Sequence, residues 1–179
     1  MKKQLLLLFL SGTFLLSACQ TQPTTAVEDI SIESKLDRNA NLANYKTYTW
    51  LATAEILIDP DKNLNAPGFN VEEHITTHVN KEMKKQGLTE SEKSPDLYLS
   101  YVLGVNMDRL KLKADPDTGM MIKKNVPKGE LLITFIDAKT QYVVWVASAH
   151  AGVKNAGTET TKIRLQYAIE EMFKKLPKS

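Results

Sequence analysis

The chain has 179 residues and a mass of 20.1 kDa, with 42% hydrophobic and 25% charged residues. This size and composition suit one globular domain and exclude a multi-span membrane protein. The formal net charge of +2 comes from Lys2 and Lys3, because the basic and acidic residues of the remaining chain balance. That balance argues against nucleic acid as the partner, and the single cysteine, Cys19, excludes an intramolecular disulfide.

The first 18 residues are predicted to be a secretory signal peptide. Lys2 and Lys3 are followed by the apolar run Leu5–Leu10 and then by small residues, a pattern typical of a signal that is removed. Residues 16–19, Leu-Ser-Ala-Cys, resemble the lipobox of bacterial lipoproteins. The resemblance implies cleavage before Cys19 and acylation of this residue with diacylglycerol and a further fatty acid such as palmitate. The alternative is an ordinary signal peptide followed by a free cysteine.

Acyl chains on Cys19 would hold the protein on a membrane without spanning it, because each buried CH₂ contributes about 0.8 kcal/mol. Gln20 follows the cysteine, whereas an aspartate at this place retains enterobacterial lipoproteins in the inner membrane. Resemblance to that rule implies the outer membrane, facing the periplasm of a Gram-negative bacterium. The polar residues 19–27 are predicted to be a flexible tether, and residues 28–179 to be a single α+β domain.

The domain is predicted to begin with two strands and a helix. Residues 30–36 and 45–51 alternate apolar and polar side chains, and the second segment is rich in aromatic and β-branched residues. Asn70 is suited to cap a helix over residues 71–86, and Gly87 is suited to end it. The apolar stripe of this helix is expected to consist of Val71, Ile75, Val79 and Met83.

The second half of the domain is predicted to contain three strands and a closing helix. Residues 96–106 alternate as a half-buried strand does, and residues 107–128 are expected to form a projecting, mobile hairpin or loop. Residues 131–137 and 142–149 predict an antiparallel hairpin, and residues 159–176 predict a helix. The apolar stripe of that helix is expected to consist of Leu165, Ala168, Ile169, Met172, Phe173 and Leu176.

The resulting element order is β-β-α-β-β-β-α. It lacks the regular alternation of strand and helix that a doubly wound parallel sheet requires. We therefore expect an α+β fold with a mostly antiparallel sheet of about five strands and two helices packed on one face. We also expect Trp50 and Trp145 to be core residues, because both lie among alternating apolar residues of predicted strands.

Five segments spread over the domain carry a family resemblance. They are Leu36–Trp50, Ser94–Tyr98, Gly129–Thr140, Val143–Trp145 and the closing helix with its Leu-Pro end. Together they resemble the bacterial lipoprotein family called domain of unknown function 4136. None of these segments is a catalytic motif, so the resemblance implies a lipoprotein and little about activity. Gln141 stands where a glycine often closes the turn, and Val146 stands where an arginine often follows the tryptophan, so no role of that arginine is carried over.

The best candidate for a metal site is His74 and His78, one turn apart, with Glu82 a further turn on. The His-Glu-x-x-His motif is absent and a fourth ligand is missing. We therefore predict no metal site and no cofactor, with both histidines at the border of the apolar stripe. Asp115 and Asp117 lie in a Pro-Asp-Thr-Gly turn, which explains them better than a calcium loop does.

The clearest charge asymmetry lies in residues 107–128. The basic residues of this segment are Arg109, Lys111, Lys113, Lys123, Lys124 and Lys128. Leu110 and Leu112 alternate with the first three, so one face of a strand there would be apolar and the other cationic. The cationic face is a candidate contact for lipid headgroups or an acidic partner. Alternatively, the lysines protect a strand edge from aggregation.

No catalytic signature is found in the sequence, since Gly-x-Ser-x-Gly is absent. We predict a lipid-anchored protein of the cell envelope that binds or scaffolds another envelope component without catalysis. The competing prediction is an enzyme or metal-dependent module that acts on an envelope substrate. Buried ionisable residues converging in one pocket would favour the enzyme, whereas an exposed edge or hairpin would favour binding. The sequence makes no prediction of the oligomeric state.

Overall fold

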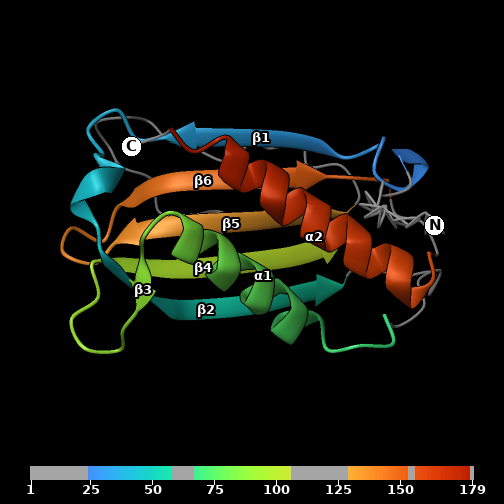
Figure 1. Cartoon of the computed structure of the whole chain (residues 1–179), viewed down its shortest axis with the longest axis horizontal. Helices are drawn as coiled ribbons and strands as arrows, with labels where there is room; N and C mark the ends of the chain where they lie inside the picture. The colour runs from blue at the N-terminus through green and yellow to red at the C-terminus, as the bar shows by residue number, and fades with distance from the viewer. Residues whose placement is uncertain (1–23, 58–66, 106–128, 153–155, 178–179) are drawn as a thin grey trace, which may run out of the picture.

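The computed structural model describes residues 24–57, 67–105, 129–152 and 156–177. They form two layers, a six-stranded sheet and a pair of helices that lie on the same face of it (Figure 1). The elements are η1 (Thr24–Ala26), β1 (Ser31–Leu36), η2 (Leu42–Asn44), β2 (Thr47–Leu57), α1 (Val71–Lys85), β3 (Thr89–Glu90), β4 (Leu97–Val105), β5 (Glu130–Asp137), β6 (Val143–His150) and α2 (Thr158–Lys174), where η1 and η2 are short 3-10 helices. The predicted α+β class is therefore confirmed.

The strand order across the sheet is β1-β6-β5-β4-β2-β3. The pairs β1–β6, β6–β5 and β5–β4 are antiparallel, whereas β2 is parallel to both β4 and β3. The predicted count of about five strands is one too few, because the two residues of β3 are too short to show a period. The antiparallel prediction also misses the β2–β4 pair: α1 connects these strands as a crossover helix, and such a connection makes them parallel.

The β5–β6 hairpin contains a strained turn and a β-bulge. The N–H of Asp137 donates to the carbonyl of Tyr142 at 2.9 Å and so closes the turn. Gln141 has a φ of +65°, in the left-handed region that favours glycine. The register then shifts by one residue between Phe135 and Ile136, so that the rest of the hairpin is displaced from a regular pairing.

Both ends of α1 follow the sequence prediction. The Asn70 side chain accepts a hydrogen bond from the Glu73 N–H at 3.0 Å, which satisfies one of the free donors of the first turn. Gly87 has a φ of +80° directly after the helix, where a side chain would be strained. The predicted stripe of Val71, Ile75, Val79 and Met83 is buried against the sheet. No helix in the described ranges combines the length and apolarity needed to cross a bilayer.

The apolar core lies between the sheet and the two helices. Trp145 of β6 is fully buried, with its ring centroid 4.5 Å from that of Phe135 on β5 and 5.6 Å from that of Phe173 on α2. Trp50 packs at the border of this core, and its Nε1–H donates to Asn80 Oδ1 of α1 at 3.0 Å. These contacts confirm the predicted core role of Trp145, place Trp50 at the core border, and join the sheet to both helices.

The described part of the domain starts before the predicted boundary at residue 28. Val27 is only 9% exposed, although the sequence places it in the tether. The guanidinium of Arg164 on α2 donates to the carbonyl of Ala26 and to both carboxylate oxygens of Asp29, the latter at 2.7 and 3.0 Å. A paired arginine of this kind fixes orientation as well as distance, so residues 26–29 are held against α2.

Candidate functional site

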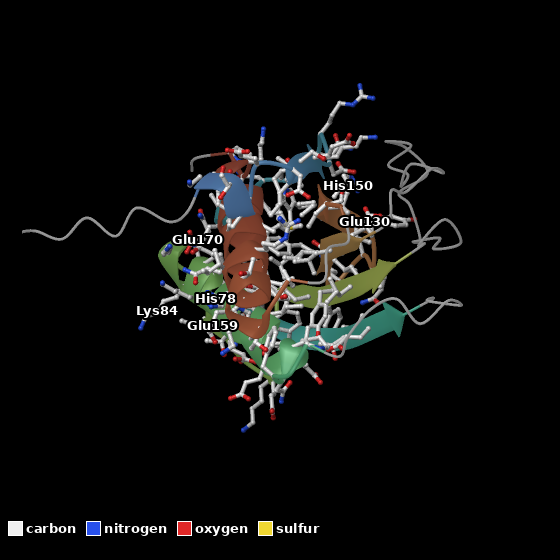
Figure 2. The ribbon with its side chains drawn as sticks, turned by 90° about the vertical axis from the view of Figure 1, so that its right-hand side faces the viewer. His78, Lys84, Glu130, His150, Glu159 and Glu170 are labelled. Carbon is white, nitrogen blue, oxygen red and sulfur yellow. The ribbon has the colours of Figure 1, made fainter. Side chains whose placement is uncertain are left out.

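Two of the sites predicted from sequence lie outside the described residues. One is the lipidation residue Cys19, and the other is the cationic segment with Arg109, Lys111, Lys113, Lys123 and Lys124. Within the described residues, ionisable side chains gather in three places, and two of these lie on opposite faces of the sheet. Figure 2 shows Glu130 and His150 on the side of the sheet away from the helices, and His78 and Glu170 among the helices.

The group on the face of the sheet away from the helices consists of Glu130, Ser148 and His150, here called the Glu130 cluster. Glu130 is the first residue of β5 and lies directly opposite His150, the last residue of β6. Ser148 lies two residues before His150, so its side chain is on the same face. The Ser148 Oγ and His150 Nε2 atoms are hydrogen-bonded at 2.9 Å, and His150 Nδ1 lies 3.6 Å from Glu130 Oε1.

Burial dominates the electrostatics of this cluster. Glu130 is only 2% exposed, and this burial raises the pKa of its carboxyl group to about 7. The hydrogen bond from Ser148 opposes the rise, whereas the negative charge of Glu33 on β1 adds to it. The carboxyl of Glu130 therefore titrates near neutral pH, where an exposed glutamate is fully ionised.

The chain of contacts from Ser148 through His150 to Glu130 has the order of a hydrolase triad, which sequence motifs did not reveal. Catalysis by such a triad also needs N–H donors for the oxyanion of the intermediate. Ser148 lies in the middle of β6, between Glu33 on β1 and Leu132 on β5. Because β6 is hydrogen-bonded on both sides there, the neighbouring amides are taken up by the sheet.

The histidines of α1 make contacts between the two helices. His74 Nε2 donates to the carbonyl of Lys162 on α2 at 3.1 Å, and the rings of His74 and His78 lie 4.5 Å apart between centroids. Burial lowers the pKa of His78, and the neighbouring His74 and Lys81 lower it further. Among the described residues, no group of three His, Cys, Asp or Glu side chains is placed to hold a metal ion. The contacts described for this pair are those between the two rings and from His74 to α2.

A third polar group, which the sequence analysis missed, joins strand ends at one end of the sheet. The Tyr45 hydroxyl donates to Asp137 Oδ2 at 2.9 Å, at the end of β5. Asp96, just before β4, accepts from the N–H groups of Lys46 and Thr47 at 2.7 and 2.9 Å. These backbone hydrogen bonds lower the pKa of Asp96, and burial together with the bond to Asp137 raises that of Tyr45. All of these residues fall in segments that carry the family resemblance.

The described residues thus define an α+β protein with one sheet, helices on a single face and the Glu130 cluster on the other. The family described as Domain of unknown function (DUF4136) matches residues 32–178, and the chain belongs to this family. No curated protein shows significant similarity to the sequence.

Three solved structures are similar to this chain, two of them with a TM-score of at least 0.5. A DUF4136 family protein from Bacteroides thetaiotaomicron has a TM-score of 0.57 and 12% identity, covering 82% of this chain and 95% of that one. A PDZ domain protein from Parabacteroides distasonis has a TM-score of 0.50 and 18% identity, covering 83% and 36%. The PelC dodecamer from Paraburkholderia phytofirmans has a TM-score of 0.47 and 13% identity, covering 83% and 99%. Identities this low concern the fold alone.

Proposed function

We propose that this protein is a lipid-anchored protein of the cell envelope that binds another envelope component without catalysis. The observation that carries the proposal is the Leu-Ser-Ala-Cys sequence of residues 16–19, which stands shortly before a folded domain. Membership of a family of unknown activity is compatible with this role. The proposed partners are the membrane, through the acyl chains on Cys19, and an envelope protein.

The anchor is tested with Cys19→Ala in the full chain, produced in a Gram-negative host. We expect an uncleaved precursor without acyl chains, because the thiol is the attachment point and cleavage follows acylation. Intact-mass spectrometry of the membrane fraction measures both changes. Ser17→Ala is the matched control: it keeps a small side chain next to the cleavage point and is expected to be processed and acylated. A mature, membrane-anchored Cys19→Ala protein of unchanged mobility would disprove the anchor.

The proposed location is the outer membrane, on the side facing the periplasm. Gln20 supports it, since the retaining aspartate is absent from this place. Separation of inner and outer membranes by density should find the protein in the outer membrane. Gln20→Asp should move it to the inner membrane, whereas Gln20→Asn, which has nearly the same shape without the charge, should not. Wild-type protein in the inner membrane would contradict this location.

The proposed contact surface is the cationic segment. Replacement of Arg109, Lys111, Lys113, Lys123 and Lys124 by alanine should abolish crosslinks to the envelope partner, because a cationic surface recognises an anionic one. The matched control replaces five exposed lysines of the described domain, Lys81, Lys84, Lys93, Lys139 and Lys175. A photo-crosslinker that does not react through lysine is needed, so that lost crosslinks report lost binding. Intact crosslinks in the first variant would exclude the segment as the contact.

An enzyme acting on an envelope substrate is the second candidate, since the Glu130 cluster has the order of a triad. A fluorophosphonate probe tests it, because such probes react with a serine that a histidine activates. We expect no labelling of Ser148, for want of free N–H donors beside it. Labelling that disappears in Ser148→Ala would instead identify a serine hydrolase.

A further inference from the structure

The two edges of the sheet differ in how they are protected from further pairing. At one edge, β3 covers the first residues of β2, Thr47 and Tyr48, and a register shift between Trp50 and Ala52 interrupts the strand beyond. Bulges of this kind discourage edge-to-edge association. At the other edge, β1 is the outermost strand (Figure 1), it contains no proline, and its register with β6 is regular throughout.

The backbone groups that β1 directs outward can be identified from one hydrogen bond. The Asp37 N–H donates to the carbonyl of Val144, the residue opposite it in the continued register. Bonded and non-bonded pairs alternate along an antiparallel ladder. The odd-numbered residues of β1 therefore bond to β6, and Ile32, Ser34 and Leu36 direct their N–H and C=O groups to the outer edge. In the part of the chain that the structure describes, no strand lies beyond this edge.

We propose that β1 is a self-association surface, on which β1 of a second copy of this chain pairs antiparallel about a two-fold axis at Ser34. In this register Ser34 faces its own counterpart, and Ile32 faces Leu36 of the second copy. All outward-directed backbone groups of these three residues then pair with one another. The two sheets become continuous, with the helices of both copies on the same face.

Charge complementarity selects this register over its neighbours. Glu33 and Lys35 are both exposed and both point away from the helices. With the axis at Ser34, Glu33 of each copy lies opposite Lys35 of the other, in a non-bonded pair where side chains are closest. The outward N–H and C=O groups pair only when even-numbered residues face even-numbered residues of the second copy. The nearest other positions of the two-fold axis are therefore residues 33 and 35. Those registers place Glu33 against Glu33 or Lys35 against Lys35, and like charges directly opposite destabilise a sheet.

Disulfide trapping in the full chain tests the axis. Ser34→Cys should give a covalent dimer under mild oxidation, because bonded antiparallel neighbours lie about 5.5 Å apart between Cα atoms, within disulfide range. Ser31→Cys is the matched control: it is the same change at an exposed serine of the same strand. Residue 31 of the second copy would lie about 20 Å away, because it is six residues along the strand from the residue that faces Ser31. The unaltered chain, with Cys19 alone, gives the background.

Charge reversal tests the register. In the Ser34→Cys background, Glu33→Lys or Lys35→Glu should each weaken the dimer about tenfold, since two attractive pairs become repulsive. The double reversal should restore it, which a merely structural effect of either change would not do. Three outcomes would overturn the proposal: equal trapping of Ser31→Cys and Ser34→Cys, trapping of Ser34→Cys to a different protein, or no recovery in the double reversal.

Discussion

The two faces of β5 are both buried, yet they hold different chemistry. Toward the helices, Ile133 and Phe135 enter an apolar core that also contains Trp145. On the face away from the helices, Glu130 and Thr134 are as deeply buried as the core residues, at 2% and 1% exposure. Apolar burial stabilises the fold at every pH, whereas a buried carboxyl group destabilises the fold once it loses its proton. The first face supports the fold, and the second makes its stability depend on pH.

The largest effect is expected on the helix face. Phe135→Ala should lower the free energy of unfolding by about 3–5 kcal/mol, because it leaves a cavity beside Trp145 and Phe173. Urea unfolding measures this loss. Leu51→Ala, at a side chain that is 55% exposed, is the control and should change stability by about 0.5 kcal/mol or less. Similar losses in the two variants would mean that the helix face is not the core.

The Glu130 cluster is tested by the pH dependence of the free energy of unfolding. The pKa of Glu130 is about 7 in the folded protein and 4.5 as its ordinary value, so between these values the folded state holds a proton that the unfolded state has released. Stability from this group is therefore complete below about pH 4.5 and is lost as the pH rises to about 7. The loss should amount to about 3 kcal/mol.

Glu130→Gln keeps the shape of the side chain and removes the titration. The difference in unfolding free energy between wild type and this variant should fall from pH 4.5 to 7 and then level off. Glu92→Gln, at an exposed residue, is the control for the same substitution elsewhere on the chain. His150 Nδ1 lies 3.6 Å from the carboxyl group, and the negative charge of Glu33 raises the midpoint. If the difference in unfolding free energy between wild type and Glu130→Gln did not change with pH, the Glu130 cluster would not cause the pH dependence of stability.

The end of the sheet that carries Tyr45 and Asp137 should contribute less to the free energy of unfolding. Tyr45→Phe removes the hydrogen bond to Asp137 and should cost about 1.5–3 kcal/mol, since the acceptor is charged. Burial raises the pKa of Asp137, but its hydrogen bonds outweigh this and hold the pKa below the usual value. The cost should therefore shrink as the pH falls and Asp137 takes up a proton. Thermal unfolding at neutral and acid pH, with Tyr98→Phe as control, measures both. A cost that is the same at acid pH would exclude the bond to the carboxylate.

The smallest effect is expected at the hairpin turn. Gln141→Gly should raise stability by about 0.5 kcal/mol, because glycine adopts the φ of +65° without strain. The same substitution at Gln86, whose φ is −80°, should lower stability instead. Urea midpoints of the two variants should thus move in opposite directions. A loss in Gln141→Gly would mean that the bond of the Gln141 side chain to the Ala138 carbonyl outweighs the strain.

Local patterns were enough to predict the class and most element positions. The alternation of β4, the Asn70 cap and the Gly87 end depend on residues close in sequence, and each was confirmed. The parallel pairing of β2 with β4 depends on where a crossover helix packs, which no short segment encodes. For the same reason the joining role of Asp96 was not predicted, since its partners lie across the sheet.

The Glu130 cluster was missed for a more specific reason. A regular hairpin that pairs Asp137 with Tyr142 would place Glu130 opposite Ala149, whose side chain points to the helices. The bulge next to Phe135 shifts the register by one residue and brings Glu130 opposite His150. Because a shift of one residue exchanges the faces of a strand, the cluster depends on a bulge that the hydrophobic pattern does not reveal. Gln141 in place of glycine indicated an irregular turn, but it did not indicate which way the register of the hairpin shifts.

The pairing of the first strand with the last has a consequence for biogenesis. Ser31 lies opposite His150, so β1 has no partner in the sheet until β6 has been synthesised. Long-range pairing of this kind slows folding, because a long loop of chain must close before the contact is gained. Under the proposed export through a signal peptide, slow pairing would keep the precursor unfolded and able to thread through a translocation channel. The sheet would then be completed only after the C-terminal strand had crossed the membrane.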